Sequence, residues 1–363
     1  MSFKTVSKSS DKKNARYLVG KLKNFDPSLQ AYFMLSACCL RPRQLPPDHS
    51  PELGLGTGDK IGKTDSGKTS DKNNVLFMPR CVPVVGRQTY PMWKGVVSGL
   101  GLIRKWKFPK TLMFLPIEML PESVKEFKIG DKQLLQWLCD FLKIFFSEMN
   151  VNFATNYNLS QVKFKTRYHS VTGKKQILVS DLYSSLHSSF NIPRSNYILA
   201  LTWTDLYPTE ELNFVLGEAS YSCRCAVFGF GRYEPKSYVS TPDGDNANKG
   251  ITDENKLALD GQLLWKLIRV ASHETCHLLG LNHCLFFECS MNESKSVKEA
   301  LHQPLFLCPV CLRKLHKSLG FDIRQRYAQL RDFLQNTNNH YQNDSLQASI
   351  LWLDRCLEKL QIG

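Results

Sequence analysis

Apolar and polar residues follow regular helix and strand spacings from about residue 111 onward. The run TLMFLPI, which starts at Thr111, is short and continuously apolar, as buried strands are. From Leu134 to Met149, leucine and phenylalanine recur every three or four residues, which predicts a helix with one broad apolar face. Apolar and basic residues alternate from Val162 to Tyr168, which predicts a half-buried strand.

The later part of the chain continues this mixture of strands and helices. Further strands are expected at 197–204, 212–216 and 225–232, with a short helix at 179–188. The strongest helical pattern runs from Asn255 to Leu279, and amphipathic helices are expected at 324–334 and 346–360. This order predicts an α/β fold with a mixed twisted sheet.

The N-terminal part has a different composition. Residues 41–74 are crowded with Pro, Gly, Ser, Lys and Asp and contain no aromatic residue, which predicts a disordered linker. Within it, GKTDSGKT at 62–69 matches a phosphate-loop pattern, but no buried strand precedes it and no helix follows, so we interpret the match as chance. We therefore expect a basic N-terminal extension at 1–104, a main domain at 105–320 and C-terminal helices at 321–363.

Charge and cysteine usage limit the choice of partners and compartment. The 47 basic and 33 acidic residues give a net charge of +14, half of it within the first 80 residues. No aromatic residues interleave with these basic residues in the manner of RNA-binding proteins, so solvated lysines on an arm explain the bias, and nucleic acid is not an expected partner. The longest apolar run, Ala31 to Leu40, is too short for a membrane, and the 12 cysteines show no disulfide framework. We expect a soluble monomer with reduced thiols in the cytosol or the nucleus.

A histidine pattern gives the chain its chemistry. His273 and His277 are four residues apart on the expected helix, so both imidazoles project from one face and can bind one metal ion. Gly280 suits the left-handed backbone that ends a helix, and the redirected chain brings in His283 as a third ligand. Three nitrogen ligands leave zinc a fourth position for water, whose pKa falls to about 7. Glu274 is placed to take the proton of this zinc-bound water as it attacks a peptide carbonyl.

The full string HETCHLLGLNH matches H-E-x-x-H-x-x-G-x-x-H, the pattern of metzincin peptidases, which is completed by a methionine turn below the metal. Met291 follows eight residues after His283. Spacing alone is equally met by an ordinary core methionine.

Four cysteines predict a second metal site directly after the histidines. Cys284 and Cys289 are followed by Cys308 and Cys311, and this C-x4-C and C-x2-C spacing suits one tetrahedral zinc ion with four thiolate ligands. Such a site is closed to water and structural. We expect it to connect the loop of His283 and Met291 to the following segment.

The run from His273 to Leu315 resembles the archaemetzincins, which combine the metzincin histidines with four cysteines for a second zinc ion. A weaker resemblance extends upstream through LTWTDLYPTEELNFVLGEAS and the strand at 225–233, and none is found for residues 1–100. The resemblance implies the following roles by position: catalytic zinc ligands His273, His277 and His283; general base Glu274; methionine turn Met291; second-zinc ligands Cys284, Cys289, Cys308 and Cys311. Where the family often has a Gly-Ser pair after the methionine, this chain has Asn292, Glu293 and Ser294, which predicts a differently shaped turn.

Together these features predict a zincin-like domain of the metzincin type with an active-site helix and a C-terminal subdomain held by the four-cysteine zinc site. The expected function is zinc-dependent peptide hydrolysis with two zinc ions, and the resemblance implies aminopeptidase-like action on small peptides. The competing hypothesis is a zinc module without catalysis that contacts nucleic acid or a protein. Glu274 argues against it, because a purely structural site needs no general base.

The segment from Asn213 to Leu216 adds one open hypothesis. It is either a plain structural strand or the edge strand above the cleft, along which an extended peptide substrate pairs through its main chain.

Overall fold

The computed structural model describes residues 9–39, 76–80, 88–104, 110–117, 121–154, 164–170, 173–189, 191–193, 195–230, 259–294 and 297–361. The linker expected at 41–74, including the phosphate-loop pattern at 62–69, lies outside these residues. The beginnings of the strand expected at Val162 and of the helix expected at Asn255 lie outside them as well.

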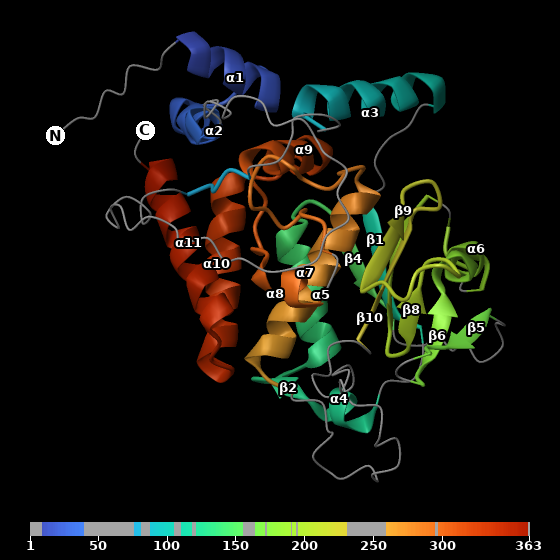
Figure 1. The fold of residues 1–363 in the computed structure, drawn as a ribbon. Helices are drawn as coiled ribbons and strands as arrows, with labels where there is room; N and C mark the ends of the chain where they lie inside the picture. Colours follow the sequence, from blue (N-terminus) through green and yellow to red (C-terminus); the bar gives the residue numbers. More distant parts are fainter. Residues whose placement is uncertain are drawn as a thin grey trace, which may run out of the picture.

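A five-stranded mixed sheet forms the centre of the described fold (Figure 1). Its strand order is β4-β1-β7-β10-β9, in which the first four strands run parallel and β9 runs antiparallel to β10. The strands are β1 (Thr111–Pro116), β4 (Asn150–Phe153), β7 (Tyr197–Thr202), β9 (Gly217–Ser220) and β10 (Cys225–Gly229). The central strands β7 and β10 are buried along their whole length, because helices cover both faces of a parallel sheet.

Consecutive residues of the sheet contribute to two separate cores. Leu199 and Ala226 pack in the larger core with α5 and α7, whereas the next residues, Ala200 and Val227, pack in the smaller core with α6. The helices are α5 (Leu134–Phe145), α6 (Val179–Ser189) and α7 (Gly261–Leu278). The helix α7 therefore lies on the same sheet face as α5.

A second, three-stranded sheet lies beside the main one and supports the chain that enters β9. It has the order β5-β6-β8, with β5 (Thr166–Tyr168), β6 (Lys175–Leu178) and β8 (Asp205–Tyr207). The Arg167 guanidinium donates hydrogen bonds to the carbonyl oxygens of Glu210, Leu212 and Asn213. These bonds fix the segment that precedes β9. A short hairpin of β2 (Lys128–Ile129) and β3 (Lys132–Gln133) precedes α5.

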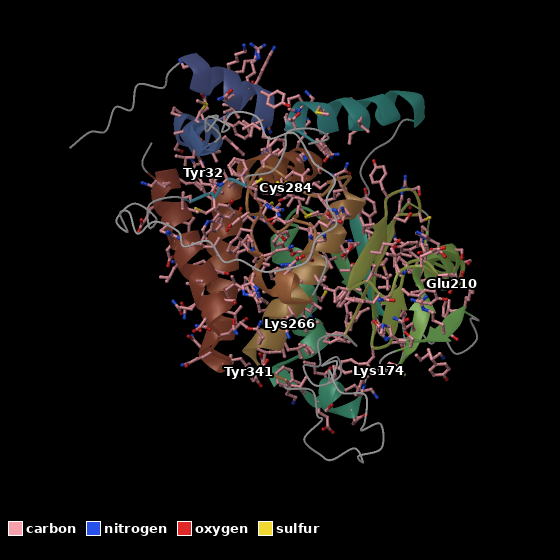
Figure 2. The ribbon with its side chains drawn as sticks, viewed as in Figure 1. Tyr32, Lys174, Glu210, Lys266, Cys284 and Tyr341 are labelled. Carbon is pink, nitrogen blue, oxygen red and sulfur yellow. The ribbon has the colours of Figure 1, made fainter. Side chains whose placement is uncertain are left out.

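The first and last helices of the chain pack against each other. The hydroxyl of Tyr32, which is labelled in Figure 2, lies 3.1 Å from that of Tyr327, and Arg324 forms an ion pair with Asp26 at 2.8 Å. These contacts join the region of α2 to α10. The helices not yet given are α1 (Ser9–Val19), α2 (Pro27–Cys39), α3 (Tyr90–Arg104), α4 (Glu122–Glu126), α8 (Val297–His302), α9 (Pro309–Leu319), α10 (Ile323–His340) and α11 (Asp344–Gln361). The expected boundaries at residues 104 and 320 thus separate helices that are in contact. No helix in the described ranges is both long enough and apolar enough to cross a membrane.

The mixed α/β class predicted from the sequence is confirmed, but several elements differ from those expected. The strand expected at 212–216 is wrong: only Val215 forms a bridge, to Leu206, and the edge strand β9 begins at Gly217. The small residues of β9 carry little strand preference, and pairing with β10 decides their conformation. The helix expected to end at Leu334 continues to His340, where Thr337 accepts a hydrogen bond from buried Trp137.

Candidate active site

The helix α7 positions the first residues of the metal-binding motif. Its N-terminus is capped by Asp260, whose side chain accepts a hydrogen bond from the Leu263 amide. At its C-terminal end His273, Glu274 and His277 occupy one side, where His273 and Glu274 are buried. The structure therefore brings the two helical histidines of the motif to one point.

The hydrogen bonds of these histidines show where their lone pairs lie. His273 Nδ1 is 2.6 Å from the Ser290 carbonyl oxygen, and His277 Nδ1 is 2.6 Å from that of Leu281. Because a carbonyl only accepts, each Nδ1 carries the proton and each Nε2 presents a lone pair. The two Nε2 atoms face each other at 3.0 Å. Two lone pairs at this distance repel unless a cation lies between them, and tetrahedral zinc separates its nitrogen ligands by about 3.3 Å.

A turn at the end of α7 brings the third histidine to the same point. Gly280 adopts φ +77°, the left-handed conformation expected of the residue that ends the helix. The ring of His283 then lies 5.4 Å from that of His273 and 4.9 Å from that of His277, measured between ring centroids. The nitrogen ligand atoms of all three residues lie within 4.8 Å of one another.

The electrostatics of the three imidazoles suit a metal ion. Burial, with the neighbouring His283, lowers the pKa of His277 to about 4, and burial also lowers the pKa values of His273 and His283. All three rings are therefore neutral near pH 7, the form in which imidazole binds metal. Three convergent neutral nitrogens fit zinc in an open site.

Glu274 lies in a space that only a glycine leaves free. A Cβ atom on Gly217, the first residue of β9, would lie 2.8 Å from the Glu274 Oε1 atom and 2.8 Å from its Cγ. Burial first, and then the charge of Glu218, raise the pKa of Glu274 to about 8, whereas Arg269 acts to lower it. A cation at the histidines opposes this rise, since it favours the charged carboxylate.

A cleft of about 630 Å³ opens on the histidine site. One wall is formed by residues 212–219, which include the first three residues of β9, and the other by α7 together with His283, Glu293 and Ser294. The segment 213–216 of the open hypothesis thus lies on the cleft wall, although the pairing strand itself begins at Gly217. The cleft gives an extended ligand access to both the histidines and Glu274.

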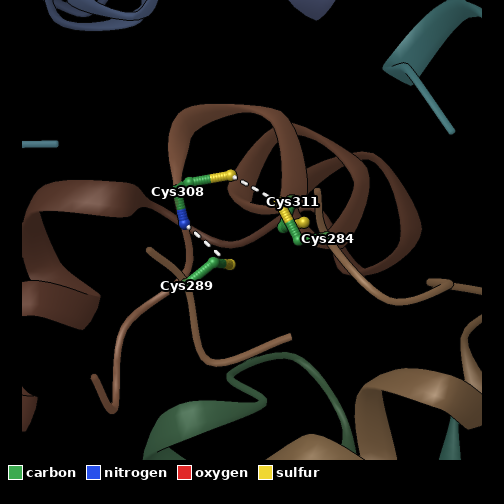
Figure 3. A group of neighbouring side chains, drawn as sticks. All are labelled: Cys284, Cys289, Cys308 and Cys311. Atoms are coloured by element: carbon green, nitrogen blue, oxygen red, sulfur yellow. Dashed lines mark hydrogen bonds between the residues drawn. The ribbon is translucent and has the colours of Figure 1, made fainter. Parts of the chain in front are cut away.

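The four predicted cysteines form a second cluster (Figure 3). Their sulfur atoms lie within 4.8 Å of one another, and Cys284 Sγ is 3.6 Å from Cys308 Sγ. Main-chain amides of Met291 and Cys308 donate to Cys289 Sγ at 3.5 and 3.2 Å. All four side chains are at most 3% exposed, so this site is closed to solvent.

Burial opposes the ionisation of two of these thiols. Burial raises the pKa values of Cys289 and Cys308, while hydrogen bonds from the other three thiols lower that of Cys284. All four cysteines are free thiols, and four thiolates at these distances fit tetrahedral zinc, whose sulfur ligands lie about 3.8 Å apart. The donor set is that of a structural site.

The turn after Cys289 is held by Asn292, whose importance the sequence did not show. Its side-chain amide donates to the carbonyl oxygens of Cys284 and Phe287, at 2.7 and 2.9 Å, and its oxygen accepts from the Cys289 amide. Met291 is fully buried beside it. The residue that departs from the family's Gly-Ser pattern is therefore the one that closes the loop between the first two cysteines.

Two residues distant in sequence hold the loop that leads to His283. Gln88 donates to the Gly280 carbonyl and accepts from the Asn282 amide, and buried Lys314 donates to Gln88 Oε1 at 2.8 Å. Trp93 Nε1 donates to the Leu279 carbonyl. No motif marks these residues, because the contacts span about 190 residues of sequence. The segment before the domain expected at 105–320 thus contributes to the site.

Similarity to known proteins agrees with this geometry. Residues 257–317 match the model of Peptidase family M54. The chain is 30% identical to archaemetzincin-2 of Mus musculus over 57% of this chain and 60% of that protein, and 29% identical to archaemetzincin-1 of Homo sapiens over 66% and 50%. The matched regions therefore span 60% of the length of the mouse protein and 50% of the length of the human archaemetzincin-1. A crystal structure of archaemetzincin from Methanopyrus kandleri has 21% identity and a TM-score of 0.39, with 58% of this chain and 96% of that chain covered. The family model and the sequence relatives confirm the resemblance that the motif indicates.

Proposed function

We propose that this relative of the archaemetzincins is a zinc-dependent peptidase of the metzincin type, in which Glu274 is the general base. The observation that supports it most directly is the pair of His273 and His277 lone pairs facing each other at 3.0 Å beside a buried glutamate. A structural metal site has no use for this glutamate. The cleft of about 630 Å³ provides room for a peptide at the same point.

The proposed reaction assigns a separate task to each residue of the motif. His273, His277 and His283 would hold the catalytic zinc ion, which when bound supplies a Lewis acid that acidifies water and polarises the peptide carbonyl. Glu274 takes a proton from the attacking water as the new carbon–oxygen bond forms. It then gives the proton to the leaving amine as the carbon–nitrogen bond breaks. Met291 supports the floor of the site through its buried turn.

The number of zinc ions, the mode of cleavage and the compartment are inferred from the two clusters and from the resemblance to the family. We infer two zinc ions per chain, one at the histidines and one at Cys284, Cys289, Cys308 and Cys311. We also infer aminopeptidase-like action on small peptides by a monomer. The free thiols suit a reducing compartment such as the cytosol or nucleus.

The substitution Glu274→Gln tests the mechanism. It keeps the shape of the side chain but removes the base, so peptide cleavage by the zinc-loaded protein should fall by about 100- to 10,000-fold. Zinc content, measured by atomic emission, should not change. Glu288→Gln, a change in an exposed glutamate outside the cleft, is the matched control and should keep full activity. Cleavage that persists in a metal-replete Glu274→Gln sample contradicts the mechanism.

A further inference from the structure

Four basic residues near the start of the chain line one groove. Composition alone indicates solvated lysines on an arm in this region. In the structure, a groove of about 590 Å³ between α1 and α2 is lined by Lys12 and Arg16 of α1 and by Lys21 and Lys23 of the turn that follows. All four residues are exposed. We call this feature the basic groove.

The floor of the basic groove is apolar. Ala15, Leu22 and Met34 line it together with the basic residues. Ala15 is buried, and Leu22 and Met34 are half-buried and pack against the larger core. A ligand in the groove therefore meets apolar side chains at the bottom and positive charges at the rim.

No acidic side chain of the described residues neutralises this rim. The only carboxylate from residue 12 to residue 39 is that of Asp26, which forms an ion pair with Arg324. The four basic residues of the rim take part in none of the ion pairs among the described residues. Four like charges around one groove create a positive potential, which attracts an anionic ligand.

The chemistry of the groove separates the possible anionic ligands. Single-stranded nucleic acid binds where its bases stack on aromatic side chains, and no aromatic residue is among the described residues that line the groove. Tyr17 is exposed on α1 but is not part of this lining. A membrane surface needs apolar side chains that project outward, whereas the apolar side chains here lie at the floor. A peptide with acidic side chains around an aliphatic one matches both the floor and the rim.

The spacing along α1 also suits an extended peptide. Lys12 and Arg16 are four residues apart on one face of the helix, which separates them by about 6 Å along its axis. Side chains two residues apart in an extended peptide lie on the same side, about 6.7 Å from each other. Two carboxylates of such a peptide can therefore reach the two basic residues of α1 at the same time.

We propose that the basic groove binds an acidic segment of a partner protein. Carboxylates of the segment lie at the four basic residues, and an aliphatic side chain lies against Leu22 and Met34. This surface is separate from the catalytic site, because no residue of the basic groove lines the cleft at the histidines. In Figure 1, α1 and α2 lie away from β9, which borders that cleft. The proposal therefore does not depend on the proposed peptidase function.

Binding is measured by fluorescence anisotropy at about 0.15 M salt, with a labelled peptide of glutamates around one central leucine. The double substitution Lys12→Glu and Arg16→Glu should weaken the binding of this peptide by about tenfold or more, because two attractions become repulsions. Lys110→Glu with Lys128→Glu is the matched control: it changes the net charge equally, at exposed positions outside the groove, and should leave the affinity within about twofold of wild-type. Equal losses in both double variants would show that only the overall charge of the protein matters, which overturns the proposal.

Two further comparisons on the wild-type protein test the floor of the groove and the class of partner. A peptide with serine in place of the central leucine should bind about three- to tenfold more weakly, because the aliphatic contact is lost. Equal affinity of the two peptides would overturn the role of the groove. A single-stranded oligonucleotide of the same net charge and phosphatidylserine vesicles should both bind more weakly than the leucine peptide. Tighter binding of either one would overturn the choice of an acidic peptide, and binding of none of the three probes would overturn the basic groove as an interaction surface.

Discussion

The histidine cluster and the cysteine cluster are joined by a single peptide bond, between His283 and Cys284, but their surroundings are opposite. The histidine cluster opens to a cleft, and His283 itself is exposed. The cysteine cluster is closed, with each side chain at most 3% exposed. Zinc sites that catalyse keep one position open, whereas structural sites use all four. The two neighbouring clusters thus have the surroundings that the proposed open site and the proposed closed site require.

The closed cluster also supports the open one. The Ser290 carbonyl that orients His273 belongs to the turn between Cys289 and Asn292, and the Cys284 amide donates to the Met291 carbonyl at 2.6 Å. Hydrogen bonds that orient a metal-binding histidine contribute strongly to metal affinity. The comparison therefore predicts an asymmetry. Substitutions in the cysteine cluster should weaken zinc binding at both clusters, whereas substitutions around the histidines should weaken zinc binding at the histidine cluster alone.

The largest effect is expected from Cys308→Ser. Loss of one thiolate should reduce the zinc content from about two equivalents to about one or less. It should also lower the free energy of unfolding by at least about 3 kcal/mol, which is a small part of the folding free energy that structural zinc contributes in zinc-finger peptides. Zinc analysis and urea unfolding measure the two changes. Peptidase activity should fall as well, because the turn that orients His273 loosens.

Cys139→Ser is the control for this prediction. Cys139 is fully buried in α5 and belongs to neither metal-binding group, so the same chemical change there should cost about 1–3 kcal/mol without loss of zinc. Two full zinc equivalents in Cys308→Ser would show that the cysteine cluster is not a metal site.

An intermediate effect on peptidase activity, without an effect on the cysteine cluster, is expected from Gly217→Ala. The added Cβ would meet the Glu274 carboxylate at 2.8 Å and displace it. Because misplacement of a reacting group by about 1 Å can cost about 100-fold, kcat/KM should fall by about 10- to 100-fold while zinc content stays constant. Gly99→Ala adds the same methyl group on α3, where no atom lies within 4 Å, and should leave kcat/KM as it is. Equal activities of the two variants would contradict the position of Glu274.

Those parts of the candidate site that depend on residues close together in the sequence can be predicted from it. The spacing of His273 and His277 on one helix face, the helix end at Gly280 and the grouping of the cysteines follow from local rules. The strand expected at 212–216 was placed by hydrophobic pattern, but the strand lies at Gly217–Ser220, where close packing against Glu274 requires a small residue. A hydrophobic pattern indicates which residues are buried, but it does not indicate which backbone must approach the Glu274 side chain.

Contacts between distant segments could not be predicted from a single sequence. Gln88 lies in the part assigned to an N-terminal extension, and nothing in its neighbourhood indicates a metal site. Its role appears only when folding brings it to Gly280 and Lys314. The departure at Asn292 was visible in the sequence, but its effect on the loop needed the hydrogen bonds of the folded chain.

The smallest effect is expected from Gln88→Ala, which alters the loop between α7 and His283. The variant loses the bonds of the Gln88 side chain to the Gly280 carbonyl and the Asn282 amide, while the bond from Lys314 to the Gln88 main-chain oxygen remains. The loop of His283 then loses orientation, so the affinity of the histidine cluster for zinc should fall by about tenfold, and the free energy of unfolding by about 1–2 kcal/mol. Competition with a chelator should show one weakened and one unchanged zinc ion. Gln30→Ala, which removes a single bond to the Phe25 carbonyl away from either cluster, should leave both affinities unchanged. If Gln88→Ala weakened the cysteine-bound zinc equally, the clusters would form one cooperative unit, and the asymmetry between them would be wrong.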